Sequence, residues 1–349
     1  MYLKGNRKLL ISLIIIALLL CIGVISSLPK CKIPIKVLLL PKFELGELTG
    51  DSVGEAQEFY EAYLQGADEY DISGDGPDKK LYVKDGIALY VCGIGKVNSS
   101  LNTTAVLNDE RFDFSDTYFI SVGCCGGAVE TATMGDAFVI TTAVDYDLGH
   151  HADARDLADQ NGNSWFYDAH LSEHAKISLD KNLTEKVFNL VKDIRPETTE
   201  VTRKYMSVAF DNAEWAIRDP QVLKGTTITA DNYWKGIYSH NDALKMIEVY
   251  ECPDPFVSSE MEDAAIGLAL EYHNKLDHYI IIRTCINMDV FMVNATPENL
   301  WADPYNIRYS SEDDALETFD IFNTAMKNEF KAVDRAVQAI LSGEINQVE

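Results

Sequence analysis

The sequence predicts a single α/β domain built on a mostly parallel or mixed sheet. Apolar runs of strand length recur along the chain, several of them end in glycine-rich turns, and helix-like segments follow these turns. Strands that alternate with helices in this way form a sheet whose faces are covered by the helices. We expect this domain to span residues 33–345.

The elements of this domain are expected in a regular order. The run IPIKVLLLP, residues 33–41, predicts a buried first strand, and a polar loop leads from it to a helix that begins near Gly54. Further on, the pattern predicts a strand–turn–helix unit at 86–107, strands at 116–129, 135–149, 226–236 and 277–291, a helix at 259–273 and a closing amphipathic helix at 311–341.

The N-terminus differs in composition from the rest of the chain. Lys4, Arg7 and Lys8 precede an uncharged run from Leu9 to Leu28 that ends in small residues. This is the pattern of a secretory signal, and the run is also long enough to cross a bilayer as an uncleaved anchor. We therefore expect residues 1–28 to act as a signal peptide or anchor and the domain to work outside the cytoplasm.

The overall charge restricts the kinds of partner. The formal net charge is −25 and apolar residues make up 47% of the chain. Such a charge disfavours nucleic acid and anionic membrane surfaces as partners. We expect a small-molecule ligand and no nucleic acid, and composition leaves assembly into a homo-oligomer open.

Cysteine and histidine clusters carry little catalytic or metal-binding signal. Cys124 and Cys125 lie among glycines at an expected strand end, with no histidine paired to them, and their small side chains leave room for a ligand. His150 and His151 are adjacent in the acidic stretch 145–156, and neighbouring histidines point in different directions on most backbones. We expect a hydrogen-bonded loop there, with no metal and no organic cofactor.

The stretch VSSEMEDAAIGLALEYH, residues 257–273, raises the question of why three acids precede an apolar helix. One interpretation is that the acids cap the helix, because carboxylates near a helix N-terminus are stabilised by its dipole and free N–H groups. The other is that a carboxylate here binds the hydroxyl groups of a sugar. Helix signals alone do not separate the two.

Five motifs together resemble one protein group. GIGKVN, GCCGGA, ITADNYW, SEMEDAA and IIIRTCINMD occur in the order and spacing of the nucleoside phosphorylase and nucleosidase superfamily. MEDAA, ADNYW and DYDLGHHADARD look most like its purine nucleoside permease (NUP) family. The resemblance covers roughly residues 33–341 and implies a three-layer α/β/α sandwich with a distorted mixed sheet.

The resemblance also implies where a purine nucleoside binds. Met261 would pack on the ribose and Glu262 would bind its hydroxyls, with Glu260 as a neighbouring candidate. The aromatic rings of Tyr233 and Trp234 would stack on the base. Three further residues, namely Asn232, Asp231 and Gly126, complete the expected base site.

For the leaving group, the resemblance points to Arg283, Asn287 and Asp289. Asn287 occupies a position where nucleosidases have an aspartate, and an asparagine cannot deliver a proton, although it can hydrogen-bond the base. Asp289 could supply the acid instead, so the assignment stays divided between these two residues.

The nucleophile is the remaining choice. Phosphorylases of the superfamily hold phosphate with arginines near the first strand, whereas PKFELGELTG contains acids and only Lys42. Nucleosidases instead have a glutamate there that activates water, and Glu44 or Glu47, together with Arg283, would serve. We therefore favour hydrolysis over phosphorolysis, and the family's name keeps a third reading open, a non-catalytic nucleoside-binding or uptake component.

Overall fold

The computed structural model describes residues 31–50, 53–72, 79–149, 151–153, 164–166, 174–297 and 312–348, of which 151–153, 164–166 and 312–319 are described as backbone only. The contacts divide the chain into two units. In the first, strand β1 (Ile33–Pro34) pairs in parallel with β6 (Phe112–Asp113), and the Ile33 N–H donates to Arg111 O at 2.8 Å. The strand expected at 33–41 is thus two strands, because β1 and the following β2 pair with different partners.

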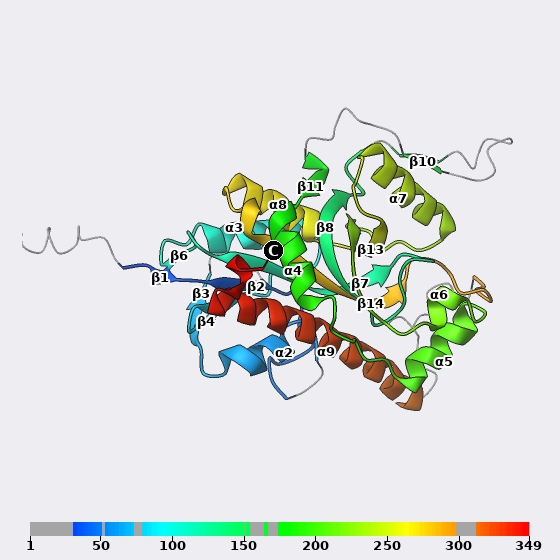
Figure 1. The fold of residues 1–349 in the computed structure, drawn as a ribbon, viewed down its shortest axis with the longest axis horizontal. Helices are drawn as coiled ribbons and strands as arrows, with labels where there is room; N and C mark the ends of the chain where they lie inside the picture. Colours follow the sequence, from blue (N-terminus) through cyan, green and yellow to red (C-terminus); the bar gives the residue numbers. More distant parts are fainter. Residues whose placement is uncertain are drawn as a thin grey trace, which may run out of the picture. The chain divides into compact units, whose positions relative to one another are not determined.

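The second unit, residues 35–109 and 114–349, contains a ten-stranded sheet (Figure 1). Nine strands follow the order β11-β8-β12-β13-β7-β2-β5-β4-β3, and β14 pairs with both β7 and β8. The strands of this sheet are β2 (Val37–Leu40), β3 (Asp68–Asp71), β4 (Lys80–Lys84), β5 (Ile87–Leu89), β7 (Tyr118–Gly127), β8 (Ala137–Asp145), β11 (Lys176–Ser178), β12 (Val222–Thr229), β13 (Phe256–Glu260) and β14 (Tyr279–Met288). Two further strands, β9 (His151–Asp153) and β10 (Ser164–Phe166), form an antiparallel pair.

The sheet is mixed and strongly distorted, as predicted. Strand β14 runs parallel to β7 and antiparallel to β8, so that β8, β12, β13, β7 and β14 close into a ring of paired strands. Ser259 of β13 pairs with Gly126 of β7, and Asn287 of β14 pairs with the same glycine from the other side. The last residues of three strands therefore meet at one point.

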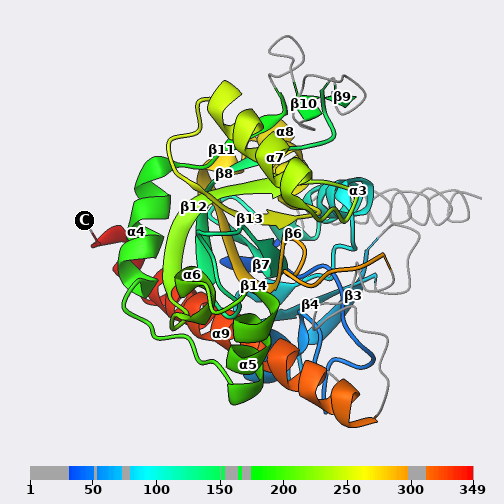
Figure 2. The same cartoon turned by 90° about the vertical axis from the view of Figure 1, so that its right-hand side faces the viewer.

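Helices cover both sides of this sheet. Figure 2 shows α3, α7 and α8 on one side and α4, α5, α6 and α9 on the other, which confirms the three-layer arrangement. The helices are α2 (Gln57–Phe59), continued by a π-helical turn (Tyr60–Leu64), α3 (Lys96–Leu107), α4 (Lys181–Val191), α5 (Glu200–Ala209), α6 (Glu214–Ile217), α7 (Ile237–Val249), α8 (Asp263–Tyr272) and α9 (Glu312–Ser342), with short 3₁₀ turns at Leu276–His278 and Glu344–Asn346.

The main core lies between the sheet and α9. The side chains of β2 are fully buried, and β7 and β14 are buried along almost their whole length, as strands covered on both faces are. The apolar stripe of α9, which includes Val333 and Val337, packs against them. The polar residues at the ends of these central strands lie at the edge of this core.

Several elements differ from the sequence prediction. Strand β13 was not predicted, because its five residues directly precede the helical run of α8 and lack a turn signal. The predicted helix near Gly54 begins at Gln57, and the strand predicted at 226–236 is β12, which begins and ends earlier. Residues 1–28 lie outside the described part of the chain. Among the described residues, none of the helices combines the length and the hydropathy of a membrane span.

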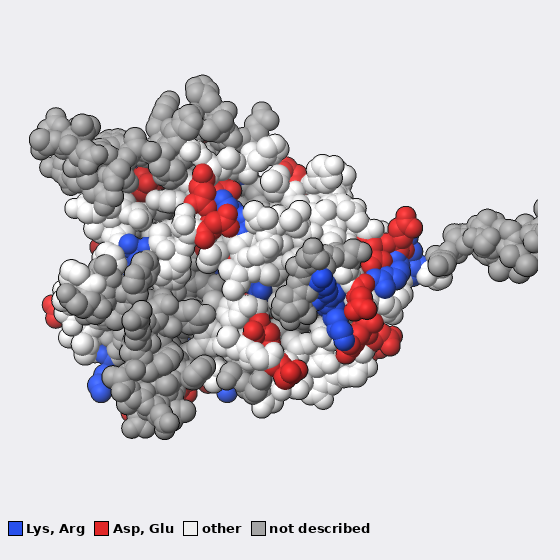
Figure 3. Space-filling model, turned by 180° about the vertical axis from the view of Figure 1, so that it is seen from behind, with Lys and Arg blue, Asp and Glu red and all other residues white. Residues whose placement is uncertain are grey.

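On the face shown in Figure 3, acidic side chains gather in several clusters, some beside basic side chains, with broad uncharged areas between them. No continuous basic stripe is visible among the described atoms of this face.

Candidate active site

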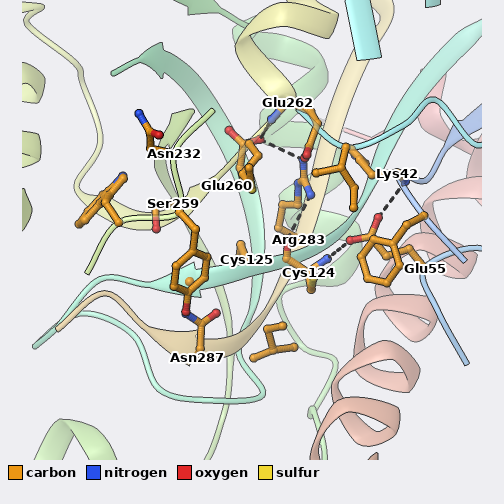
Figure 4. A pocket seen from close by; sticks show the side chains of 17 residues that line it. Lys42, Glu55, Cys124, Cys125, Asn232, Ser259, Glu260, Glu262, Arg283 and Asn287 are labelled. Atoms are coloured by element: carbon orange, nitrogen blue, oxygen red, sulfur yellow. Dashed lines mark hydrogen bonds and ion pairs between the residues drawn. The ribbon is translucent and has the colours of Figure 1, made fainter. Parts of the chain in front are cut away.

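A cavity opens where the strand ends converge, and together with the solvent at its mouth it encloses about 740 Å³ (Figure 4). Its wall is formed by the ends of β7, β13 and β14, the segment after β2 and the loop after β12. Charged side chains gather at one end of the cavity, and uncharged polar and aromatic side chains at the other.

Arg283 organises the charged end. Its side chain is 1% exposed, and its guanidinium lies 3.0 Å from Glu260, 3.1 Å from Glu262 and 2.8 Å from Asp263. Burial acts to raise the pKa of Asp263, but the charges of Arg283 and Lys42 outweigh it and lower the pKa below its usual value. Asp263 is therefore the ionised partner that holds Arg283 in place.

The glutamates before α8 divide the two roles that the sequence left open. Glu260 Oε2 accepts hydrogen bonds from the backbone N–H groups of Glu262 at 2.6 Å and Asp263 at 2.7 Å, so Glu260 caps the helix. Glu262 makes no capping bond with its side chain and instead lines the cavity. A helix cap and a cavity-lining carboxylate are thus both present, on different residues.

Glu262 is held from two sides. One carboxylate oxygen contacts Arg283, and the other accepts a 3.0 Å hydrogen bond from the Gly95 N–H. Gly95 has φ +87°, and a Cβ there would lie 3.2 Å from Asp231 Oδ1, so the close approach favours glycine. The glycine turn before α3 therefore orients a carboxylate of the cavity.

Lys96, the next residue, joins this turn to two other loops. Its ammonium lies 2.6 Å from Asp145 and 2.9 Å from Asp147, and its backbone N–H donates to Asp231 Oδ1 at 2.8 Å. These ion pairs account for the first acids of the stretch 145–156. His150 lies outside the described residues, and for His151 only the backbone is described.

The base end of the predicted site is uncharged. Asn287 Nδ2 donates to the Tyr233 hydroxyl at 2.5 Å, and a Cβ on Gly126 would lie 2.9 Å from Ser259 Oγ. Trp234 stacks on Tyr146 with ring centroids 5.6 Å apart, which fixes its ring. This end therefore offers amide and hydroxyl hydrogen bonds beside aromatic faces, with Gly126 leaving space for a planar ligand.

Glu55 is a further carboxylate at the charged end of the cavity wall, beside Lys42 (Figure 4). Its carboxylate accepts hydrogen bonds from the N–H groups of Cys124 and Lys42, both at 2.8 Å (Figure 4). The Lys42 ammonium donates to Leu40 O, Ser121 Oγ and Val122 O and lies 3.8 Å from Asp263. Burial, followed by the charge of Glu55, raises the pKa of the Cys124 thiol well above its usual value, so this thiol is a poor nucleophile.

The structure brings most of the sequence-predicted residues to the cavity. Those in its wall are Glu260, Met261, Glu262, Arg283, Asn287, Asn232, Tyr233, Trp234 and Gly126. Asp231 is exposed beside Lys96 and is not part of the wall. Glu44, Glu47 and Asp289 are likewise absent from it.

Glu44 is used by the backbone instead. Its carboxylate accepts hydrogen bonds from the N–H groups of Leu45, Gly54, Ala56 and Gln57, which ties the loop after β2 to the start of α2. Glu47 lines a separate surface hollow beside Tyr60 and Tyr82. The geometry therefore does not support either residue as the water-activating base that the sequence suggested.

Asp289 faces away from the cavity wall. Its carboxylate contacts His240 Nδ1 at 2.6 Å and accepts a hydrogen bond from the Val129 N–H at 3.0 Å. Burial raises the pKa of Asp289, and His240 opposes the increase. These contacts anchor the end of β14 to α7, and of the two residues Asn287 is the one that lines the cavity.

Sequence reasoning missed Glu55, Ser259 and the buried position of Lys42. Three glutamates lie between β2 and α2, and nothing in their spacing identifies Glu55 as the one that enters the cavity. Its position directly before the first helical residues is the one available signal, since strand-to-helix turns line sites at the carboxyl ends of strands.

A comparison with known protein families places this geometry in context. The model of the family described as purine nucleoside permease (NUP) matches residues 34–344, nearly the whole described domain. The chain belongs to this family. The match confirms the resemblance carried by the five sequence motifs.

One curated relative agrees with this assignment. A Schizosaccharomyces pombe protein described as a probable purine nucleoside permease is 27% identical over 196 residues. The matched region is 51% of this chain and 56% of the relative, so the chain spans little more than half the length of the relative it matches.

Solved structures show the same fold. A 5′-methylthioadenosine/S-adenosylhomocysteine nucleosidase from Neisseria meningitidis, in complex with methylthio-immucillin-A, has a TM-score of 0.52 at 17% identity, with 87% of this chain and 99% of that chain covered. The corresponding nucleosidase from Streptococcus pneumoniae, with 8-aminoadenine, has a TM-score of 0.50 at 16% identity, with 87% and 100% covered. These likenesses confirm the nucleosidase-type α/β/α fold.

Proposed function

We propose that this protein hydrolyses the N-glycosidic bond of purine nucleosides to free base and ribose. The observation that carries the proposal is the division of the cavity into a charged end around Glu262 and Arg283 and an uncharged, aromatic end around Asn287. A nucleoside has the same division, with a polyhydroxylated sugar joined to a planar base. The family description and the nucleosidase fold support this reading.

In the proposed reaction, Glu262 binds the ribose hydroxyls and Met261 packs against the sugar. As the C1′–N9 bond breaks, positive charge develops on the ribose ring, and the fixed Glu262 carboxylate stabilises it. The pKa of Glu262 is raised by burial, and the charge of Arg283 opposes this rise. Arg283 therefore has the role of keeping Glu262 ionised and oriented.

We assign water activation to Glu55 in place of Glu44 or Glu47. Glu55 lines the cavity, and the two backbone hydrogen bonds from Cys124 and Lys42 leave it further capacity to accept a proton. A water oxygen would bond to C1′ as the C1′–N9 bond breaks, with one water proton passing to Glu55 and the departing base taking a proton from solvent. Glu55 then returns its proton to solvent, which restores the carboxylate. Atoms and charge balance without a metal or an organic cofactor.

Phosphorolysis is the alternative for which the cavity is poorly equipped. Among the described residues of its wall, the cations are Lys42 and Arg283. Lys42 donates to three protein oxygens, and Arg283 contacts three carboxylates, so each is already engaged. Phosphate bound among these acids would lack a cationic partner.

Asn287 also indicates the kind of base. Its Nδ2 donates a hydrogen bond to the Tyr233 hydroxyl. The other amide atom, Oδ1, can then accept a hydrogen bond from a ring N–H of the base. An amide cannot protonate the base, so bases that leave readily, such as 6-oxopurines, fit this end better than adenine does. We accordingly propose inosine-like nucleosides as the preferred substrates.

A direct test is to incubate the purified protein with inosine or adenosine, with and without phosphate, and to separate the products by chromatography. We expect free hypoxanthine and ribose from inosine without phosphate. Ribose 1-phosphate as the sole sugar product would establish phosphorolysis. Stoichiometric binding without release of base would establish the third reading, a nucleoside-binding component of an uptake system, which the family's name favours.

We further propose that residues 1–28 are a signal peptide or an anchor and that cleavage takes place outside the cytoplasm. Bases released there would be taken up by a separate transporter. This would explain why an enzyme belongs to a family named for nucleoside uptake. Fractionation of expressing cells and sequencing of the mature N-terminus test this. Intact protein that retains residues 1–28 in the cytosol would contradict it.

A further inference from the structure

Glu329 of α9 lies directly behind the cavity wall. It is 1% exposed, and its carboxyl group accepts a hydrogen bond from the Gly123 N–H, while the next N–H along the chain, that of Cys124, donates to Glu55. A Cβ on Gly123 would lie 2.5 Å from Glu55 Oε1. Two carboxyl groups thus bind adjacent peptide units of one strand, and only Glu55 is part of the cavity wall.

This region contains more buried acids than buried cations. The cations are Lys42 and Arg283, and the acids are Glu55, Glu260, Glu262, Asp263 and Glu329, all less than 7% exposed. An unpaired charge in a protein interior is costly and is removed by a shift in protonation. At least some of these carboxyl groups must therefore hold a proton at neutral pH.

The hydrogen-bond donors around each buried carboxyl group indicate which acid holds the proton. Burial is the main factor that raises the pKa of both Glu260 and Glu329, to about 8 in each case. Glu260, however, accepts hydrogen bonds from a threonine hydroxyl, two backbone N–H groups and Arg283, all of which favour the ionised form. Glu329 has the Gly123 N–H and no cation within ion-pair distance among the described residues. The proton is better placed on Glu329.

The groups that act on Glu329 come from several elements. Glu55, before α2, raises its pKa, whereas Arg283 of β14 and Lys42 after β2 lower it. From β7, the thiols of Cys124 and Cys125 lie close enough for a charge on Glu329 to raise their pKa values. Of these groups, Glu55 binds the peptide unit next to the one that Glu329 binds, and it lines the cavity.

We propose that Glu329 is a positioning residue that remains a neutral carboxylic acid at neutral pH and holds the Gly123–Cys124 backbone so that Glu55 is the anionic carboxylate facing the cavity. The catalytic consequence rests on the proposed hydrolysis, whereas the protonation state of Glu329 does not. Ionised, Glu329 would put a second negative charge beside Glu55 across a single strand, which would disturb the position of Glu55.

Infrared difference spectroscopy of the full domain tests the protonation state without any substrate. We expect wild-type protein to show the carbonyl stretch of a protonated carboxylic acid at about pH 6 and to lose it as the pH is raised past about 8. That band should be missing from E329Q and present in E260Q. The control is D320N, which removes an exposed acid from the same helix. An unchanged band in E329Q would overturn the proposal.

Turnover tests the positioning role. E329L, which cannot accept the Gly123 hydrogen bond, should lower kcat by about 100-fold with KM changed less than about threefold, while E329Q, neutral and of the same shape, should recover kcat to within about tenfold of wild type. D320N should behave like wild type. Equal losses in E329L and E329Q would show that the ionised form is required and would overturn the proposal. If wild-type protein has no hydrolase activity, the proposed function fails, and the infrared band still decides the state of Glu329.

Discussion

The two ends of the cavity hold polar groups by opposite means. At the sugar end, Arg283 is buried among Glu260, Glu262 and Asp263, so that charges compensate one another inside the protein. At the base end, Asn287 and Tyr233 hydrogen-bond without any charge. The difference matches the proposed reaction, in which positive charge develops on the sugar and the base takes a proton from solvent as it departs. We therefore expect that removing the charge of Glu262 at one end and adding a charge at Asn287 at the other end change the reaction in different ways.

Removing the sugar-end charge should have the largest effect. E262Q keeps the size of the side chain and its bond to the Gly95 N–H but removes the negative charge, so kcat for inosine should fall by about 100- to 1,000-fold. Steady-state kinetics with thermal melting of the variant measures this. E47Q, outside the cavity, is the matched control. A folded E262Q with near-normal turnover would return this segment to a purely structural role.

The second test separates Glu55 from Glu44. E55Q should lower kcat by about 100-fold with the fold retained, because the water loses its base. E44Q should keep kcat but lose about 1–2 kcal/mol of unfolding free energy, since its oxygens accept four backbone N–H groups. Denaturant titration and kinetics of both variants distinguish the roles. Loss of turnover in a stable E44Q variant would favour the residue suggested by the sequence.

The base end can be given the charge that it lacks. N287D introduces an acid that can donate a proton to a departing base, so the ratio of kcat/KM for adenosine to that for inosine should rise about tenfold. N287A, which has neither group, is the comparison variant. An unchanged ratio in N287D would mean that Asn287 does not contact the base.

The smallest expected effect concerns stability. Glu329 has a folded pKa of about 8, above its ordinary value of 4.5, so the folded state binds a proton that the unfolded state has released between these values. Its contribution to stability therefore falls as pH rises from about 4.5 to about 8 and is constant above that. E329Q does not titrate, so its Tm relative to wild type should increase by a few degrees from about pH 5 to about pH 8. A constant difference in Tm would contradict the raised pKa.

The sequence alone predicted the fold class and most of the cavity. Strand-length apolar runs predicted the strands that carry Gly126 and Arg283, whereas the strand before Glu262 was not predicted; the carboxyl ends of such strands meet at one edge of a sheet. Residues within or next to these strands, including Asn287, accordingly reached the cavity wall. The residues of the site were implied by the resemblance of the motifs to the family, and they reach the cavity because the strands themselves carry these side chains there.

Tertiary structure decided the roles of residues beyond the strands. Glu44, Glu47 and Glu55 share one segment, and long-range contacts with Cys124 and Lys42 N–H groups bring Glu55 to the cavity while Glu44 binds backbone near α2. Asp289 follows Asn287 by two residues, yet His240 of α7 and the Val129 N–H hold it away from the cavity. Sequence spacing cannot predict such outcomes, because a loop carboxylate turns toward whichever buried donors the folded chain provides.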